Sequence, residues 1–275
     1  MSTSEIIKSI HTSREETARI IADSLGEISG KSEYELQDLF INGLEHSTNL
    51  YKKGWYDPPP KGASVLFGQK PFERLQYDSL RREVYWPQKD SFFEEETVAS
   101  VYLSSVNKKT NMIGDISLSI YNGTSNEIKE HLKLCRDTVH EIAKKTEIDM
   151  AFKDLCILGM GILKEKGLKI GWMVDDREVN FGHTVPGSYE KEEFGGTFEE
   201  IKEAIRTTRT YIHLEEDFVI KPTCAFTIEA RLVDIEETMP NVIFHYIVSF
   251  SDGERNILSN FGDIFEIMGM DYMLN

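Results

Sequence analysis

Cysteine is scarce in this sequence. The 275 residues include three cysteines, Cys135, Cys156 and Cys224, and no two of them stand in a C-x-x-C spacing. A disulfide framework and a zinc ribbon are therefore not indicated. All three lie in apolar or helical stretches of sequence, so we interpret them as core thiols in a reducing, cytoplasmic environment.

Basic residues are also in short supply. The chain has 31 Lys and Arg against 47 Asp and Glu, a formal net charge of −16. Binding to nucleic acid or to an anionic membrane needs a basic face, and the sequence shows none. A small molecule, a short peptide or another protein is the expected partner.

Long hydrophobic runs are missing as well. No apolar stretch approaches the roughly 18 residues needed to span a bilayer, and the opening MSTSEIIKSIHTSREE lacks the apolar centre of a signal peptide. We therefore expect a cytoplasmic protein. With 40% apolar and 28% charged residues, the chain has an ordinary globular composition and can bury a sizeable core.

The sequence does contain clear helical periodicity near its start. Apolar residues recur at helical spacing from Glu5 to Ile28, and Ser32 with Glu35 forms a capping-box pattern. This pattern predicts a second helix from Glu33 to about Tyr51. The helix is followed by Gly54-Trp55, and a glycine is typical just past a helix C-terminus.

The same plan returns later in the chain. A helical segment begins near Leu132, Thr146-Glu147 opens a further helix, and Gly171-Trp172 follows. The separations between corresponding positions of the two copies agree to within three residues. We therefore predict an internal duplication, with halves of about 1–123 and 124–275. The alternative is that a helix pair before Gly-Trp recurs by chance.

Strand-like segments rich in β-branched and aromatic residues follow each helix pair. They are Ala63–Gly68, Thr97–Ser105 and Ile113–Ile120 in the first half, and Cys224–Leu232 and Val242–Phe250 in the second. This order predicts an α+β fold in which a curved antiparallel sheet is backed by helices. A site would then form where the two halves meet.

The second half of the chain contains an insert of about 187–217, which precedes its strand-like segments. It contains a charged segment from Phe198 to Tyr211 that is typical of an amphipathic helix. We interpret the insert as a lid over the site or a dimer contact. A solvated surface excursion is the alternative.

These features together resemble a known family. The helix pairs, the pseudo-twofold sheet and the phrase ISGKSEYEL at Ile28–Leu36 are similar to those of the pita-bread metallopeptidases. That family includes methionine aminopeptidase, aminopeptidase P, prolidase and the metal-free creatinase. The resemblance spans nearly the whole chain and implies a single pita-bread catalytic-type domain over residues 1–275 and a homodimer. In the family, an Asp, Asp, His, Glu, Glu set holds two metal ions.

The segment VDDREVNFGHTVP, Val174–Pro186, resembles the family's metal-site loop. Here His183 with Pro186 is similar to the second family histidine, which follows the metal-binding histidine by seven residues. Counting back from His183 reaches Asp176 in this chain. The resemblance therefore places Asp176 among the metal ligands. It places His183 beside the ion as a hydrogen-bond donor or proton shuttle.

The remaining ligands follow from three further phrases. Glu229 matches the glutamate of the family's Phe-Thr-Ile-Glu, and Asp115 after Ile113-Gly114 resembles the second aspartate. The last ligand falls on His245 or, with a slip of one residue, on Phe244. The position of the first aspartate is Ser104, which is no carboxylate.

The implied ligand set is Asp115, Asp176, Glu229 and His245. Three carboxylates and one imidazole suit one Mn, Fe or Zn ion better than a pair of ions. Two of the candidate residues also have an ordinary structural explanation. His183 could be a turn histidine bonded to backbone, and Glu229 a strand glutamate paired with Arg231.

Three residues are predicted to bind substrate. Arg177 is suited to receive a carboxylate bidentately, although it could instead pair with Asp175 or Glu178 on the surface. Arg81, in a segment that mixes arginines with aromatic residues, and Tyr56, after Gly54-Trp55, are predicted to line the substrate pocket. The alternatives are core packing with surface charge for the Arg81 segment and a scaffolding role for the turn that contains Tyr56.

The sequence thus favours a hydrolase that cleaves a C–N bond in a small amino-acid-like or X-Pro peptide-like substrate with the help of one metal ion. Two alternatives stay open. One is a metal-free enzyme resembling creatinase, with His183 or His245 as the general base. The other is a catalytically inactive binding module whose acidic cleft holds a cationic partner.

Overall fold

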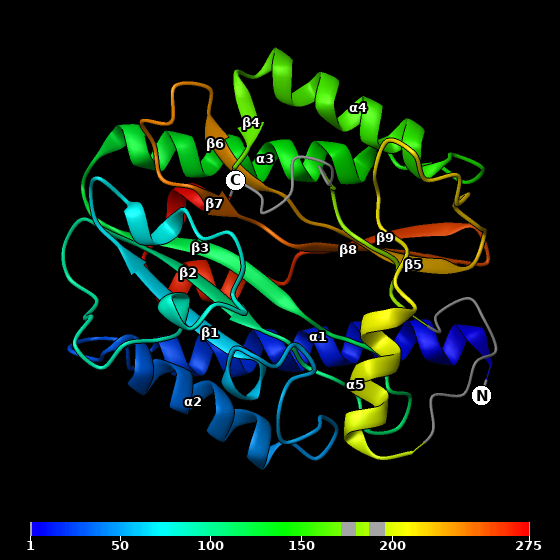
Figure 1. The fold of residues 1–275 in the computed structure, drawn as a ribbon, viewed down its shortest axis with the longest axis horizontal. Coiled ribbons are helices and arrows are strands. Elements are labelled where there is room, and N and C mark those ends of the chain that lie inside the picture. Colours follow the sequence, from blue (N-terminus) through cyan, green and yellow to red (C-terminus); the bar gives the residue numbers. More distant parts are fainter. Residues whose placement is uncertain (1, 172–179, 187–195, 275) are drawn as a thin grey trace.

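The structure is a computed structural model that describes residues 2–171, 180–186 and 196–274. Its helices are α1 (Thr3–Leu25), α2 (Glu33–His46), α3 (Asn126–Lys144), α4 (Phe152–Glu165), α5 (Phe198–Thr207) and α6 (Gly262–Ile267). Its strands are β1 (Ala63–Gly68), β2 (Thr97–Leu103), β3 (Ile116–Asn122), β4 (Leu168–Ile170), β5 (Cys224–Ile228), β6 (Arg231–Asp234), β7 (Val242–Ile243), β8 (Tyr246–Ser251) and β9 (Glu254–Leu258). Figure 1 shows the helix pair α3 and α4 above the strands and the helix pair α1 and α2 below them in this view.

The strands form three antiparallel groups, ordered β1-β2-β3, β4-β6-β7 and β5-β8-β9. The first group joins the others at β3, where Leu118 and Phe244 form an isolated antiparallel bridge. The backbone N–H of His245 also donates to the carbonyl of Ser117 at 2.9 Å. The two halves of the chain therefore meet along β3, β7 and β8, as the predicted α+β architecture requires.

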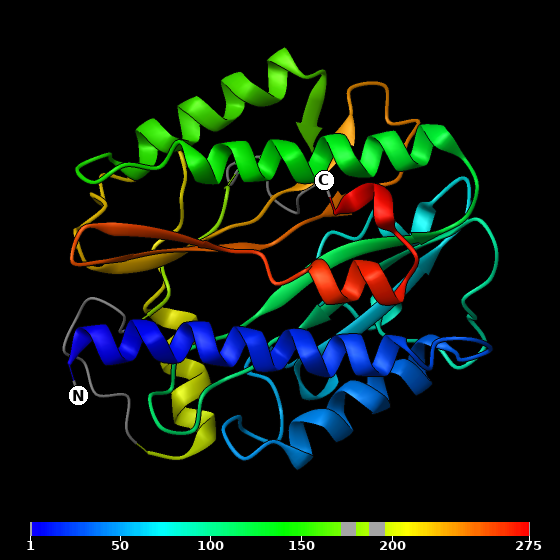
Figure 2. The same cartoon turned by 180° about the vertical axis from the view of Figure 1, so that it is seen from behind.

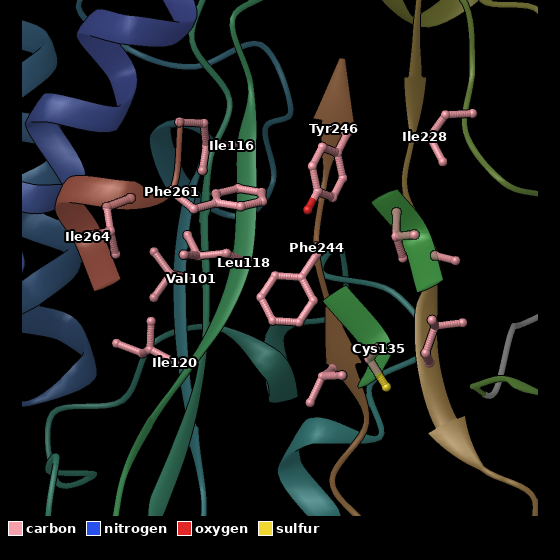
Figure 3. Close-up of a cluster of buried hydrophobic side chains, with 14 of the residues drawn as sticks. Val101, Ile116, Leu118, Ile120, Cys135, Ile228, Phe244, Tyr246, Phe261 and Ile264 are labelled. Atoms are coloured by element: carbon pink, nitrogen blue, oxygen red, sulfur yellow. The ribbon is translucent and has the colours of Figure 1, made fainter. Parts of the chain in front are cut away.

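Helices α1, α3 and α6 lie across one face of this sheet, as Figure 2 shows. The core lies between the helices and the strands. In Figure 3, Leu118 of β3 and Phe244 lie close to Phe261, which precedes α6. The Phe244 ring is fully buried and lies 6.0 Å from the ring centroid of Phe261. Burial of these large apolar side chains fixes the helix layer on this face of the sheet.

Helix boundaries follow local capping chemistry. In α2, Ser32 and Glu35 form the predicted capping box. The helix ends at His46, earlier than the predicted Tyr51, because the Ser47 hydroxyl accepts hydrogen bonds from the backbone N–H groups of Asn49 and Leu50. These bonds offer the backbone a turn in place of another helical turn.

Helix α4 begins at Phe152, whereas the sequence pattern placed its start at Thr146-Glu147. Residues before Phe152 form a turn in which Asp149 has a φ of 67°. Ala151 then bridges to Val219 in the extended conformation. The helix therefore starts only after this bridge.

Two predicted long strands are interrupted. The segment Cys224–Leu232 divides into β5 and β6, with Glu229 and Ala230 between them. The segment Val242–Phe250 divides into β7 and β8, with Phe244 and His245 between them. These interruptions lie where the halves meet, and they place Glu229 and His245 at the same point of the sheet.

The three cysteines are buried and form no disulfide, as predicted. Within the described part of the chain, no helix has both the length and the apolar character that a membrane crossing demands.

Candidate active site

A cavity of about 310 Å³ opens where the two halves meet. Its walls come from both halves and include five of the predicted site residues: Tyr56, Arg81, Asp115, His183 and Glu229. Ligand pockets of enzymes usually begin at about this size. Asp176 and Arg177 lie outside the described residues.

Asp115 directly precedes β3 and is almost completely buried. Its carboxylate accepts hydrogen bonds from Trp55 Nε1 at 2.8 and 3.0 Å and from the Tyr102 hydroxyl at 3.3 Å. Burial raises the pKa of Asp115 well above its usual value, against the opposing effect of the Trp55 hydrogen bond. The carboxyl group is therefore held by neutral donors in a dry environment.

Glu229 occupies the break between β5 and β6. One carboxylate oxygen lies 3.4 Å from Nε2 of His183 and accepts from the Thr227 hydroxyl at 3.3 Å. The other oxygen lies 3.8 Å from Nε2 of His245. Burial raises the pKa of Glu229, and the charge of Arg209 acts in the opposite direction. The pairing with Arg231 that the sequence suggested is not formed, because Arg231 donates to the carbonyls of Tyr77 and Asp78.

His183 has a defined tautomer. Its Nδ1 lies 2.9 Å from the carbonyl oxygen of Thr184, so Nδ1 carries the proton and donates. In the neutral ring, Nε2 then holds a lone pair that faces Glu229. Burial, with a further contribution from Arg209, lowers the pKa of His183 to about 3. His183 is thus a neutral ring whose free nitrogen faces the cavity.

His245 has the opposite tautomer. Its Nδ1 lies 3.0 Å from a guanidinium nitrogen of Arg14. A guanidinium can only donate, so Nδ1 accepts and Nε2 carries the proton that points toward Glu229. Burial and the Arg14 charge lower the pKa of His245 well below its usual value. Because Phe244 lies in the core, His245 is the residue of this pair that faces the site.

Arg14, in the middle of α1, was not predicted. Its guanidinium is fully buried and donates to the backbone carbonyls of Asp115, His245 and Ser259 as well as to the His245 ring. Burial lowers the pKa of Arg14 to about 9, against the opposing charge of Asp115, so the group stays cationic at neutral pH. His245 lies in the break between β7 and β8, Asp115 directly before β3 and Ser259 directly after β9. Their carbonyls are outside the strands, and the guanidinium satisfies them.

The sequence does carry a signal for Arg14. The residue lies four positions after Ile10 and four before Ala18, so it falls on the apolar stripe of its helix. A charged residue on a buried stripe needs partners of its own.

The described residues do not fit a metal ion. Glu229 lies 3.8 Å from His245, but among the described residues no three His, Cys, Asp or Glu side chains form a group that could hold a metal. Nε2 of His245 carries a proton on the side that faces the site, whereas a histidine that binds a metal needs a lone pair on that nitrogen. Ser104 is engaged with backbone, since its hydroxyl donates to Gly62 and accepts from the N–H of Tyr56.

The remaining wall is cationic and aromatic. Arg81 lies over the Tyr56 ring with its Cζ 4.4 Å from the centroid. Arg209, which follows α5, lies 4.7 Å from the Trp55 ring centroid and 5.3 Å from that of Tyr211. Helix α5 is held by the buried side chains of Ile201 and Ile205 and so positions Arg209 at the cavity. Arg209 was not predicted as a site residue, because it lies in the segment interpreted as an insert.

No protein-family model matches the chain, and no curated protein matches its sequence. Solved structures do match. The X-Pro aminopeptidase of Thermotoga maritima aligns with a TM-score of 0.63 and 16% identity, over 93% of this chain and 61% of that one. The prolidase of Pyrococcus horikoshii gives 0.64 and 16%, over 93% and 62%. The methionine aminopeptidase of Thermotoga maritima gives 0.61 and 13%, over 94% and 98%.

This chain therefore spans about three fifths of the X-Pro aminopeptidase and the prolidase, and nearly all of the methionine aminopeptidase. At these identities the agreement concerns the fold. The paired helices, the antiparallel strands and the central site agree with the architecture that the sequence predicted, and the chain has the pita-bread fold.

Proposed function

We propose that this protein is a metal-independent hydrolase that cleaves a C–N bond in a small amino-acid-like or peptide-like substrate, with His183 as the general base. The names of its structural neighbours, X-Pro aminopeptidase and prolidase, support the reaction class. The observation that carries the metal-independent form is the buried guanidinium of Arg14 between Asp115 and His245. This cation binds the ring of His245, one of the side chains that the resemblance assigns to a metal, and the backbone carbonyl of Asp115, which is another of those residues.

In the proposed reaction, Nε2 of His183 takes a proton from a water molecule as the water oxygen attacks the carbon of the C–N bond. The new C–O bond forms, the C–N bond breaks, and the His183 imidazolium returns the proton to the departing nitrogen. Glu229, 3.4 Å from Nε2, balances the positive charge on the ring during this step. The hydrogen bond from Nδ1 to Thr184 keeps the ring in the orientation that the transfer needs.

The low pKa of His183 fits this role once an anionic substrate is bound. Arg209 contributes to the lowered pKa through its positive charge. A substrate carboxylate bound at Arg209 offsets that charge and moves the pKa of His183 upward, toward the range in which a base is effective. Substrate binding would then activate the base.

The experiment is a turnover assay with X-Pro dipeptides and with N-acyl and amidino derivatives of amino acids, each with and without EDTA. We expect at least one substrate to be hydrolysed at a rate that EDTA does not change. His183→Gln should lower kcat by at least about 100-fold, the usual contribution of a general base. His46→Gln, which replaces an exposed histidine on α2, is the matched control and should keep the wild-type rate.

Two outcomes contradict the proposal. One is turnover that EDTA abolishes and a divalent metal restores. The other is a His183→Gln variant that hydrolyses the same substrate at the wild-type rate.

A further inference from the structure

We propose that the cavity binds a small ligand with two acidic groups, one received by Arg209 and the other by Arg81. The inference that this ligand is the substrate rests on the proposed function. The binding itself does not, and it is tested separately below.

Arg209 presents an unsatisfied cation to the cavity. Its guanidinium is stacked on Trp55 and Tyr211, and its Nε is buried without a hydrogen-bond partner. Ring faces stabilise a cation but accept none of its N–H groups in the plane of the guanidinium. Among the described side chains, no carboxylate lies within ion-pair distance of Arg209. A bound acid group would supply the missing acceptors.

Arg81 makes a similar stacking contact with the neighbouring aromatic ring. It stacks on Tyr56, whose centroid lies 5.4 Å from that of Trp55. Among the described residues, no carboxylate forms an ion pair with Arg81 either. The next residue behaves differently, because Arg82 forms an ion pair with Asp78. Two adjacent aromatic rings thus carry one cation each, both at the cavity wall.

The overall charge makes these two cations unusual. The chain has 47 acidic residues against 31 basic ones, so acidic partners are abundant. The third arginine of the cavity wall, Arg231, has its donors on the carbonyls of Tyr77 and Asp78. Arg81 and Arg209 alone among these three keep their donors for a ligand, and a guanidinium binds a carboxylate through two parallel hydrogen bonds.

The size and the other walls of the cavity narrow the class of ligand. A space of about 310 Å³ holds a molecule of roughly dipeptide size. The two carboxyl groups of the cavity, Asp115 and Glu229, lie near the compensating cation of Arg14. They therefore repel a bound dianion less than two isolated carboxylates would. A small dicarboxylate, or an amino-acid derivative with a second acid group, fits these conditions.

The test is isothermal titration calorimetry at low salt with the dicarboxylates from succinate to adipate, each compared with the monocarboxylate of the same chain length. We expect at least one diacid to bind at least tenfold more tightly than its monoacid. Arg81→Gln and Arg209→Gln should each remove this preference. Arg206→Gln is the matched control, because Arg206 is exposed on α5 and pairs with Glu203. It should keep the wild-type preference.

A wild-type protein that binds no diacid more tightly than its monoacid overturns the proposal. So does a preference that survives in both cavity variants. Thermal unfolding of each variant shows whether it is folded, and Arg81→Lys and Arg209→Lys, which keep the charge, should retain part of the preference. If diacids bind but no substrate is turned over, the hydrolase proposal fails and this one stands. If turnover occurs without a diacid preference, only this one fails.

Discussion

Arg14 is a buried cation that connects three distant segments of the chain. Its guanidinium binds the His245 ring and the backbone carbonyls of Asp115 and His245, and its charge acts on Asp115 and Glu229. A charge on the apolar stripe of a helix has to find all of its partners within the protein. Here the partners are 101 to 245 residues away in sequence, so no local pattern could have revealed them.

Replacing this residue should be costly. Arg14→Met keeps roughly the length of the side chain, but it leaves the buried carbonyls of Asp115 and His245 without their donor and removes a buried cation near the Asp115 carboxyl group. We expect a loss of roughly 3–5 kcal/mol in the free energy of unfolding, measured by urea denaturation. Arg19→Met, on the exposed side of the same helix, should change it by less than about 0.5 kcal/mol. Equal effects of the two substitutions would show that Arg14 has no special electrostatic role.

The lowered pKa of His183 predicts how the free energy of unfolding depends on pH. Its pKa is lowered to about 3 in the folded protein from an ordinary value of 6.5, so between these values the unfolded chain binds more protons. The contribution of His183 to the free energy of unfolding is therefore fully present above pH 6.5 and is lost as the pH falls toward 3. Between about pH 6 and pH 4, the wild type should lose about 1 kcal/mol per pH unit relative to His183→Gln. Parallel pH profiles of unfolding for the two proteins would contradict this account.

At the scale of helices and strands, local sequence patterns predicted much of the fold. Strand β1 lies at the predicted residues Ala63–Gly68, and α2 begins at the predicted capping box of Ser32. The patterns failed where tertiary contacts override them. The segment Cys224–Leu232 has strand composition throughout, yet it is interrupted at Glu229, where the site requires a side chain to leave the ladder.

The turn before β1 tests how closely these elements are packed. Gly62 has a φ of +74°, and a Cβ there would lie 2.4 Å from the Ser104 hydroxyl and 2.5 Å from Cα of Gly54. Gly62→Ala should therefore cost at least about 2 kcal/mol in the free energy of unfolding. The control is Gly161→Ala in α4, where nothing lies within 4 Å of the added Cβ. That change should stabilise the protein by up to about 1 kcal/mol. Thermal unfolding of both variants compares them directly.

For the molecule as a whole, the order of helices and strands and the resemblance to the pita-bread family predicted the fold. The same resemblance implied that Asp115, Glu229 and His245 lie together; in the structure Asp115 and Glu229 line one cavity, and His245 lies 3.8 Å from Glu229. It could not predict which nitrogen of His245 carries a proton, or that Arg14 and Arg209 enter the site. Those features depend on contacts between distant segments that differ from the family pattern.

The most direct test of the central claim is the metal content of the wild-type protein and of Arg14→Met after purification in metal-replete medium. If the guanidinium supplies the cation of the site, the wild type should contain less than about a tenth of an equivalent of Mn, Fe, Zn and Co, because a transition-metal site of usual affinity would be filled. One equivalent of any of these metals in the wild type, lost on replacing Glu229 with alanine, would contradict the account.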